Sequence, residues 1–203
     1  MVYCSQKDGE LMKKDIGAKT ILFPTPVLVV ATYDSKGKPN AMTAAWGGIC
    51  CSDPPCVTVS LRKATYTYDS LMEKRVYTIN IPGKEYAKEA DYFGFASGRD
   101  EDKFAVTGLT PVRSGFVDAP YINEFSINLE CKIVHVADLG LHTQFVGEVV
   151  NAKIDSALAG NDQQPMIEQV MPLLFAPSSG NYYTVGEEIG KAFSIGKEIE
   201  RNV

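Results

Sequence analysis

Short segments of alternating or unbroken apolar residues dominate this chain. Residues 27–33 form a run rich in Val, Leu and Ala, and a β-branched run of this kind is typical of a strand. In residues 56–62 and 125–133 apolar and polar side chains alternate strictly, as they do in a strand with one buried face. The turn residues 34–39 and the break at 138–140 each predict that the next segment returns as an antiparallel neighbour. The predicted strands are residues 27–33, 41–46, 56–62, 75–81, 125–133 and 142–154.

Helical spacing is confined to a few short segments. Apolar residues in 67–74 recur at helical intervals, and Thr65 or Thr67 is a suitable N-cap for that helix. Residues 85–96 form the strongest helix candidate. Residues 97–104 predict a second short helix with an acidic first turn.

At least six strands and only a few short helices are therefore expected. Most links between the strands are too short for helical crossovers, which predicts a mainly β fold, an antiparallel barrel with helices packed outside. A doubly wound sheet would require strands and helices to alternate, and they do not. Residues 1–20 are polar and predict an N-terminal arm with a short helix or strand. No Ser-, Gly- or Pro-rich linker interrupts the 203 residues, so we expect one domain over residues 1–203.

Composition indicates the cellular compartment of the protein and disfavours some classes of binding partner. The formal net charge of −5 and the lack of a Lys/Arg cluster argue against nucleic acid. The N-terminus lacks the order of a signal peptide, and no apolar run approaches the roughly 20 residues that cross a bilayer. The five cysteines include no Cys-x-x-Cys pair, as expected for free thiols in a reducing cytosol. We therefore expect a cytoplasmic protein with no membrane partner.

The cysteines are not expected to hold a metal. Four residues separate Cys51 from Cys56, which is poor spacing for a shared zinc ion. We predict buried, inert thiols instead, and no metal site.

Residues 40–67 carry the most distinctive chemistry. Ser60 and Arg62 share one face of a predicted strand, just before the helix that begins near Thr67. An arginine delivered to a helix N-terminus is suited to a phosphate monoester, because the guanidinium fork and the free helix N–H groups match phosphate oxygens. The small residues around Trp46 suit a flat ring lying against the backbone. Together these features suggest that the stretch holds flavin mononucleotide (FMN).

Two of these residues also have simpler interpretations, and other catalytic motifs are absent. Arg62 could be a solvated surface arginine, and Trp46 could be a core residue. No Gly-x-Gly-x-x-Gly follows a strand, residues 186–191 are one residue short of a phosphate loop, and the two histidines are His135 and His142, so Rossmann, zinc-hydrolase and triad chemistry are disfavoured. His135 falls on the apolar parity of its strand and is predicted to pack in the core or in an interface.

Several short motifs occur in order along nearly the whole chain. They are Phe-Pro-Thr-Pro-Val (23–27), Asn-Ala-Met-Thr-Ala-Ala-Trp (40–46), Ser-Leu-Arg-Lys…Tyr-Thr (60–67), Asn-Ile-Pro (80–82), Asp-Lys-Phe (102–104), His-Thr-Gln-Phe-Val-Gly-Glu-Val (142–149) and Tyr182-Tyr183…Gly186. Together they resemble the flavin reductase-like, FMN-binding split-barrel family, and its flavoredoxin branch in particular. The resemblance implies a Greek-key split β-barrel with a few peripheral helices. It also implies a homodimer with one FMN per subunit near the dimer interface.

The resemblance implies roles for individual residues. The residues expected to line the isoalloxazine ring are Met42, Thr43, Ala44 and Trp46, with backbone N–H groups of Thr43–Ala45, Ala45 included, facing its pyrimidine edge. The residues expected to hold the ribityl phosphate are Ser60, Leu61, Arg62, Lys63 and Thr67, with Lys103 as a further contact. Lys103 lies in a charged run that could instead be a solvated helix face. His142 matches a histidine near the flavin ring and would assist hydride or proton transfer.

The resemblance also implies the activity. Members of the family reduce flavin or ferric substrates with NADH or NADPH, or carry electrons between redox partners. We therefore expect an NAD(P)H-dependent flavin reductase with FMN as cofactor. The first alternative is a flavoredoxin-type electron-transfer protein, which exchanges electrons with a protein partner without oxidising NAD(P)H. A further alternative is a non-enzymatic barrel that binds another small ligand in the same pocket, or none.

Overall fold

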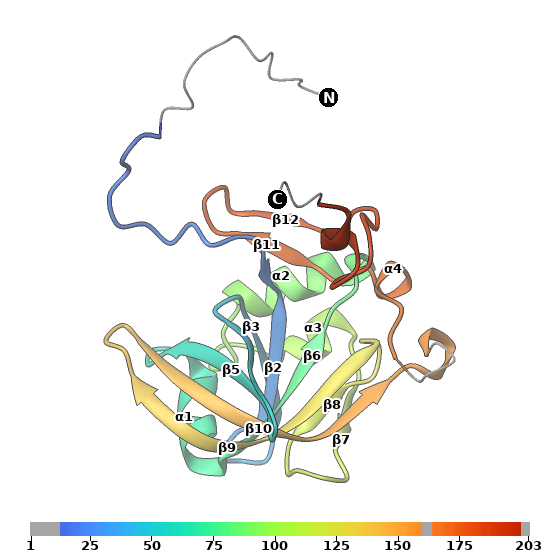
Figure 1. The fold of residues 1–203 in the computed structure, drawn as a ribbon. Coiled ribbons are helices and arrows are strands. Elements are labelled where there is room, and N and C mark those ends of the chain that lie inside the picture. The colour runs from blue at the N-terminus through green and yellow to red at the C-terminus, as the bar shows by residue number, and fades with distance from the viewer. Residues whose placement is uncertain (1–12, 160–163, 200–203) are drawn as a thin grey trace.

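One curved antiparallel sheet forms the body of the molecule (Figure 1). The structure is a computed structural model that describes residues 13–159 and 164–199. The sheet has seven strands in the order β3-β2-β6-β9-β10-β5-β4. Its strands are β2 (Leu28–Tyr33), β3 (Pro39–Ala44), β4 (Gly47–Ser52), β5 (Pro55–Arg62), β6 (Val76–Ile81), β9 (Ile127–Asp138) and β10 (His142–Ile154).

Smaller elements cover the ends of this sheet. A three-stranded sheet pairs β11 with β1 and β12, and a hairpin pairs β7 with β8. Their bounds are β1 (Thr25–Pro26), β7 (Pro111–Arg113), β8 (Pro120–Ile122), β11 (Leu174–Ala176) and β12 (Asn181–Tyr183). The helices are α1 (Tyr66–Lys74), α2 (Ala87–Phe95), α3 (Lys103–Thr107) and α4 (Ile167–Val170), with 3₁₀ turns at Lys84–Tyr86, Ser156–Leu158 and Ile195–Glu198. In Figure 1, α2 lies between the large sheet and the β11–β12 hairpin.

The unbroken apolar run in β2 reflects burial on both of its faces. Val30 belongs to the core enclosed by the large sheet and α1, together with Leu71 and Phe145. Val29 belongs to a second core that includes Phe93 of α2. A strand buried on both sides gains from apolar residues at every position, whereas a strand with one wet face alternates.

The prediction of an antiparallel, mainly β barrel with outside helices is confirmed. All of the six predicted strands are present, five of them with shifted ends and β10 with the predicted bounds, and β10 pairs antiparallel with β9 as expected. The polar face of β9 was not predicted correctly, because Asn128 and Glu130 are buried. Asn128 donates to Asn80 Oδ1 and to the Ile122 carbonyl, so β8 covers the face that alternation assigns to water.

Three local predictions differ at least in part from the structure. Residues 97–102 form turns rather than a helix, and α3 begins only at Lys103, where Asp102 Oδ1 accepts a hydrogen bond from Ala105 N at 3.1 Å. Thr65 is the N-cap of α1, one of the two predicted positions, but it makes no side-chain cap bond, because its hydroxyl donates to the Arg62 carbonyl. His135 is exposed rather than packed in the core, because the register of β9 shifts between its pairs with Val146 and Gly147. Its alternative place in an interface stays a prediction.

Two further expectations concern the chain ends. The expected helix or strand within residues 1–20 is absent from residues 13–20, and its remainder lies outside the described residues. The exposed arm of residues 13–24 runs away from the sheet in Figure 1.

Across the described ranges, no helix has the length and apolar character that a membrane crossing requires.

Candidate functional site

A polar pocket lies between the start of α1 and the loop that follows α2. Its volume is about 230 Å³. From here on it is called the polar pocket. The lining residues are Met42, Ala64, Thr65, Tyr66, Thr67, Phe93, Gly94, Phe95, Ala96, Ser97, Gly98, Arg99 and Lys103.

The ammonium group of Lys103 is the dominant charge of this pocket. Lys103 is only 4% exposed, and its Nζ donates to the carbonyls of Phe93 at 3.2 Å and Ala96 at 3.1 Å. No described carboxylate lies within 4.0 Å of Nζ. Burial lowers the pKa of Lys103 to about 8. A buried cation whose third donor has no anionic partner is expensive to maintain, which favours an anionic ligand at this position.

The beginning of α1 adds hydrogen-bond donors to the same pocket. No side chain caps α1, and the first N–H groups of a helix have no partner within the helix. Thr67 is buried, and its Oγ1 accepts a hydrogen bond from Asn40 Nδ2 at 2.9 Å. The hydroxyl proton of Thr67 therefore points to another acceptor. Helix N–H groups, a hydroxyl and an ammonium group together form a binding site suited to phosphate.

The loop after α2 is fixed against α1 at close range. A Cβ atom added at Gly98 would lie 2.3 Å from Asn40 Oδ1 and 2.7 Å from Tyr66 Cδ1. Arg99 reaches across, since its Nη1 donates to the Ala64 carbonyl at 3.1 Å and its guanidinium lies 5.4 Å from the Tyr66 ring centroid. The exposed guanidinium of Arg99 thus lies at the entrance of the polar pocket. Its other N–H groups can donate hydrogen bonds to a ligand.

Two more hollows continue from the polar pocket along the end of β3. A middle pocket of about 380 Å³ is bounded by Gly94 and Phe95, which it shares with the polar pocket, and by Thr43, Ala45 and Tyr182. It is closed by the C-terminal hairpin, where Tyr182 Oη donates to Asp91 Oδ1 at 2.9 Å.

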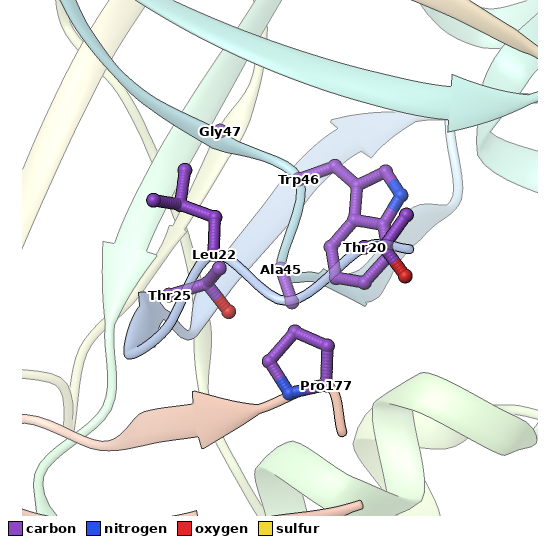
Figure 2. Close-up of a pocket in the computed structure, with 7 residues that line it drawn as sticks. All are labelled: Thr20, Leu22, Thr25, Ala45, Trp46, Gly47 and Pro177. Atoms are coloured by element: carbon purple, nitrogen blue, oxygen red, sulfur yellow. The ribbon is translucent and has the colours of Figure 1, made fainter. Parts of the chain in front are cut away.

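The third hollow surrounds Trp46 and is called the tryptophan pocket. Figure 2 shows Trp46 beside Ala45, with Pro177 facing them from below and the N-terminal arm alongside. Its volume is about 260 Å³, and its walls are mostly apolar. The lining residues are Thr20, Leu22, Thr25, Ala45, Trp46, Gly47 and Pro177. Because Ala45 also lines the middle pocket, the three hollows form one row, with charge at one end and an indole at the other.

The other predicted phosphate ligands lie at the end of β5. Arg62 is exposed and pairs in register with His142 of β10. Lys63 Nζ forms an ion pair with Asp138 Oδ2 at 2.5 Å. The ring centroid of His142 lies 6.5 Å from that of Trp46. None of these residues lines the polar pocket, so the structure divides the predicted ligands into a pocket group and a surface group.

The remaining predicted residues make contacts within the large sheet or with α2. Ala44 and Leu61 are buried in the core of the large sheet. Ser60 is half-buried, and its backbone N–H donates to the Trp46 carbonyl at 2.8 Å. Thr43 Oγ1 donates to the Ala90 carbonyl of α2. Their proposed contacts with a flavin stay predictions.

Sequence reasoning missed Asn40, Gly98 and Arg99 as members of the site. In the sequence Asn40 stands out only as part of the motif at residues 40–46, and residues 97–104 predict a helix. The Ser-Gly-Arg sequence at 97–99 was the available signal, because Ser and Gly are typical of turns. Asn40 carries no local signal, since its partner Thr67 is 27 residues away.

Comparison with known proteins identifies related chains. A family model described as flavin reductase like domain matches residues 20–185. The solved structure of flavoredoxin from Desulfovibrio vulgaris (Miyazaki F) is 52% identical, with a TM-score of 0.87, and the match covers 91% of this chain and 100% of that one. A flavoredoxin structure from Methanosarcina acetivorans is 28% identical, with a TM-score of 0.83 and coverages of 95% and 100%.

Curated relatives match over shorter stretches. The reductase component of a 4-nitrophenol 4-monooxygenase/4-nitrocatechol 2-monooxygenase from Rhodococcus opacus is 32% identical over 126 residues, which are 62% of this chain and 63% of that protein. The chain spans only 64% and 49% of the length of two uncharacterized archaeal relatives. The similar solved structures support the split-barrel form of the fold.

Proposed function

Because the chain belongs to the flavin reductase-like family, we propose that it holds FMN and acts as an electron-transfer protein of the flavoredoxin type. The observation that carries the FMN proposal is the buried ammonium group of Lys103 in the polar pocket. The similarity to a flavoredoxin, 52% identity over 91% of the chain, supports electron transfer over direct reduction by a nicotinamide.

The residues that line the three adjoining hollows match the phosphate and the ring of FMN. Lys103, Thr67 and the start of α1 would hold the phosphate, and Arg99 would close over it. Met42, Thr43, Ala45 and Trp46 would border the ring, and they line the three adjoining hollows in that order. When bound, FMN supplies the capacity to accept a hydride and to pass on one or two electrons. The protein binds the phosphate, orients the ring and limits the access of water.

A second candidate function is an NAD(P)H-dependent flavin reductase. The similarity to a monooxygenase reductase component favours it, and the tryptophan pocket offers apolar space beside Trp46 for a second flat ring. In that case His142 would assist proton or hydride transfer. His142→Ala should then slow NAD(P)H oxidation while FMN stays bound. A homodimer is also proposed, which light scattering tests.

An anaerobic titration separates the two functions. The purified protein is saturated with FMN, and its visible spectrum is followed as NADH, then NADPH, then dithionite is added. A bound flavin that is reduced only by dithionite supports the electron-transfer protein. Rapid bleaching by either nucleotide contradicts that proposal and favours the reductase. If no flavin binds after reconstitution, both proposals fail.

A further inference from the structure

The β4–β5 hairpin brings three cysteines together at an edge of the large sheet. Strand β4 is the outermost strand beside β5, and Cys51 lies directly opposite Cys56 in their antiparallel register. The register shifts between Ile49 and Cys51, so Cys50 is an extra residue next to this pair. All three thiols are free in the structure.

The register of Cys51 and Cys56 satisfies the geometry of a disulfide. Directly opposed residues of an antiparallel pair have Cα atoms about 4.5 or 5.5 Å apart, depending on the type of pair. Disulfides span Cα separations of about 4.4–6.8 Å. Either type of pair therefore brings the Cα atoms of Cys51 and Cys56 within the range that a disulfide spans.

The two thiols differ in access. Cys51 is exposed, whereas Cys56 is only 6% exposed. The prediction of buried thiols is therefore wrong for Cys51 and confirmed for Cys56. Burial raises the pKa of the Cys56 thiol, and the neighbouring thiols and the carboxylate of Glu148 raise it further. Glu148 is the β10 residue opposite Cys56. An incoming reagent can therefore reach Cys51 first, and Cys56 stays a protonated thiol until a partner forms beside it.

Metal binding does not account for this cluster. In residues 13–159 and 164–199, no three His, Cys, Asp or Glu side chains are arranged to hold a metal ion. We propose that Cys51 and Cys56 are a dithiol that exchanges reversibly with low-molecular-weight disulfides and forms a cross-strand disulfide at the edge of the sheet. This thiol site is independent of the flavin proposal.

The exchange is balanced in atoms and electrons. The Cys51 thiolate attacks a disulfide RSSR, forms the mixed disulfide Cys51–S–SR and releases one RS⁻. Cys56 then loses its proton to solvent and attacks the Cys51 sulfur, which forms the Cys51–Cys56 bond and releases the second RS⁻. The dithiol is oxidised by two electrons, and RSSR is reduced to two RSH.

Oxidised glutathione is the probe, and the count of thiols that can be alkylated in denaturant is the readout. The reduced wild-type chain takes up five alkyl groups, one for each cysteine. After exposure to oxidised glutathione we expect two fewer on each chain. Reduced glutathione should restore both, which shows reversibility.

Single substitutions assign the pair. Cys50→Ser should keep the loss of two thiols, and in that variant mass spectrometry of the peptide ending at Arg62 should locate the bond at Cys51 and Cys56. Cys51→Ser should abolish the two-thiol loss, and Cys56→Ser should stop at a glutathione adduct on Cys51. Circular dichroism shows that each variant is folded.

Three outcomes overturn the proposal. The first is a wild-type chain that loses no thiols. The second is a Cys51→Ser variant that loses two thiols as readily as the wild type. The third is oxidation that yields only chains cross-linked through Cys50, seen as dimers on a non-reducing gel.

Discussion

At the scale of single residues, the polar pocket depends on one ammonium group that is removed from water. Lys103 Nζ donates to two carbonyls and lies 5.7 Å from the Phe93 ring centroid, and burial lowers the pKa of Lys103 to about 8. A bound phosphate would compensate the charge and raise that pKa again, because an opposite charge nearby favours the protonated form. Proton uptake and phosphate binding are therefore coupled at this residue.

This coupling predicts a pH dependence of FMN affinity. Below about pH 8 Lys103 is already charged, so affinity should be nearly level around pH 7. Above that pH, binding must take up a proton, and affinity should fall by up to about tenfold for each pH unit. Flavin fluorescence titrations from about pH 7 to pH 9.5 measure the slope.

The matched ligand for this experiment is riboflavin, which lacks the phosphate. Its affinity should not follow the titration of Lys103. Equal slopes for FMN and riboflavin would assign the pH dependence to another group and contradict the role of Lys103.

Residue types were easier to predict than their surroundings. The Asp-Lys-Phe motif pointed to Lys103, yet its burial depends on α2 carbonyls that pattern alone does not place beside it. The position of Arg62 between a strand and a helix predicts a phosphate ligand, and the resemblance adds Lys63. Lys63 is instead paired with Asp138, 75 residues further along. Long-range partners of this kind leave no periodic signal.

At the scale of elements, the site depends on how closely the loop after α2 approaches α1. Gly98 packs against Asn40 and Tyr66 without room for a side chain. Asn40 in turn holds the hydroxyl of Thr67. A change at Gly98 should therefore be transmitted to the phosphate donors.

Gly98→Ala tests this dependence. The new Cβ atom would collide with Asn40 Oδ1, so Asn40 must move and the Thr67 hydroxyl loses its orientation. We expect the dissociation constant for FMN to rise about tenfold, the cost of roughly one hydrogen bond. Gly115→Ala is the control, because nothing lies within 4 Å of a Cβ atom there. Unchanged affinity in Gly98→Ala would contradict the account of the loop.

The same loop shows why an element was predicted incorrectly. Residues 97–104 contain acidic residues suited to a first helical turn, but the helix begins six residues later than expected, at Lys103. Asp102 caps it there, and the preceding turn carries Gly98 into contact with α1. Tertiary contact rather than local propensity sets the start of α3.

At the scale of the whole molecule, the strands were predictable because their patterns reflect burial. Alternation located β5, and the unbroken run located β2. Strand β4 was missed because its last four residues are exposed, so it has no apolar pattern. The covering hairpins β7–β8 and β11–β12 are only three residues per strand, too short for periodicity to register.

Close packing between β10 and β6 gives a test of the fold. A Cβ atom added at Gly147 would lie 2.3 Å from Tyr77 Oη and 2.8 Å from its Cζ, and Tyr77 is fully buried. Gly147→Ala should lower the free energy of unfolding by about 1–3 kcal/mol, as overpacked cores do. Gly48→Ala, where no atom lies within 4 Å, should be nearly neutral. Urea unfolding curves measure both, and equal stabilities would contradict this packing.

The central claim is that the polar pocket binds the phosphate of FMN, and the most direct measurement compares FMN with riboflavin. Dissociation constants are determined for the wild type, Lys103→Met and the exposed control Lys132→Met. The wild type and Lys132→Met should prefer FMN by about 100-fold, and Lys103→Met should reduce that preference at least about tenfold, because a charge-assisted hydrogen bond contributes about 1.5–3 kcal/mol. A wild type that binds both flavins equally, or a Lys103→Met variant that keeps the full preference, would contradict the account.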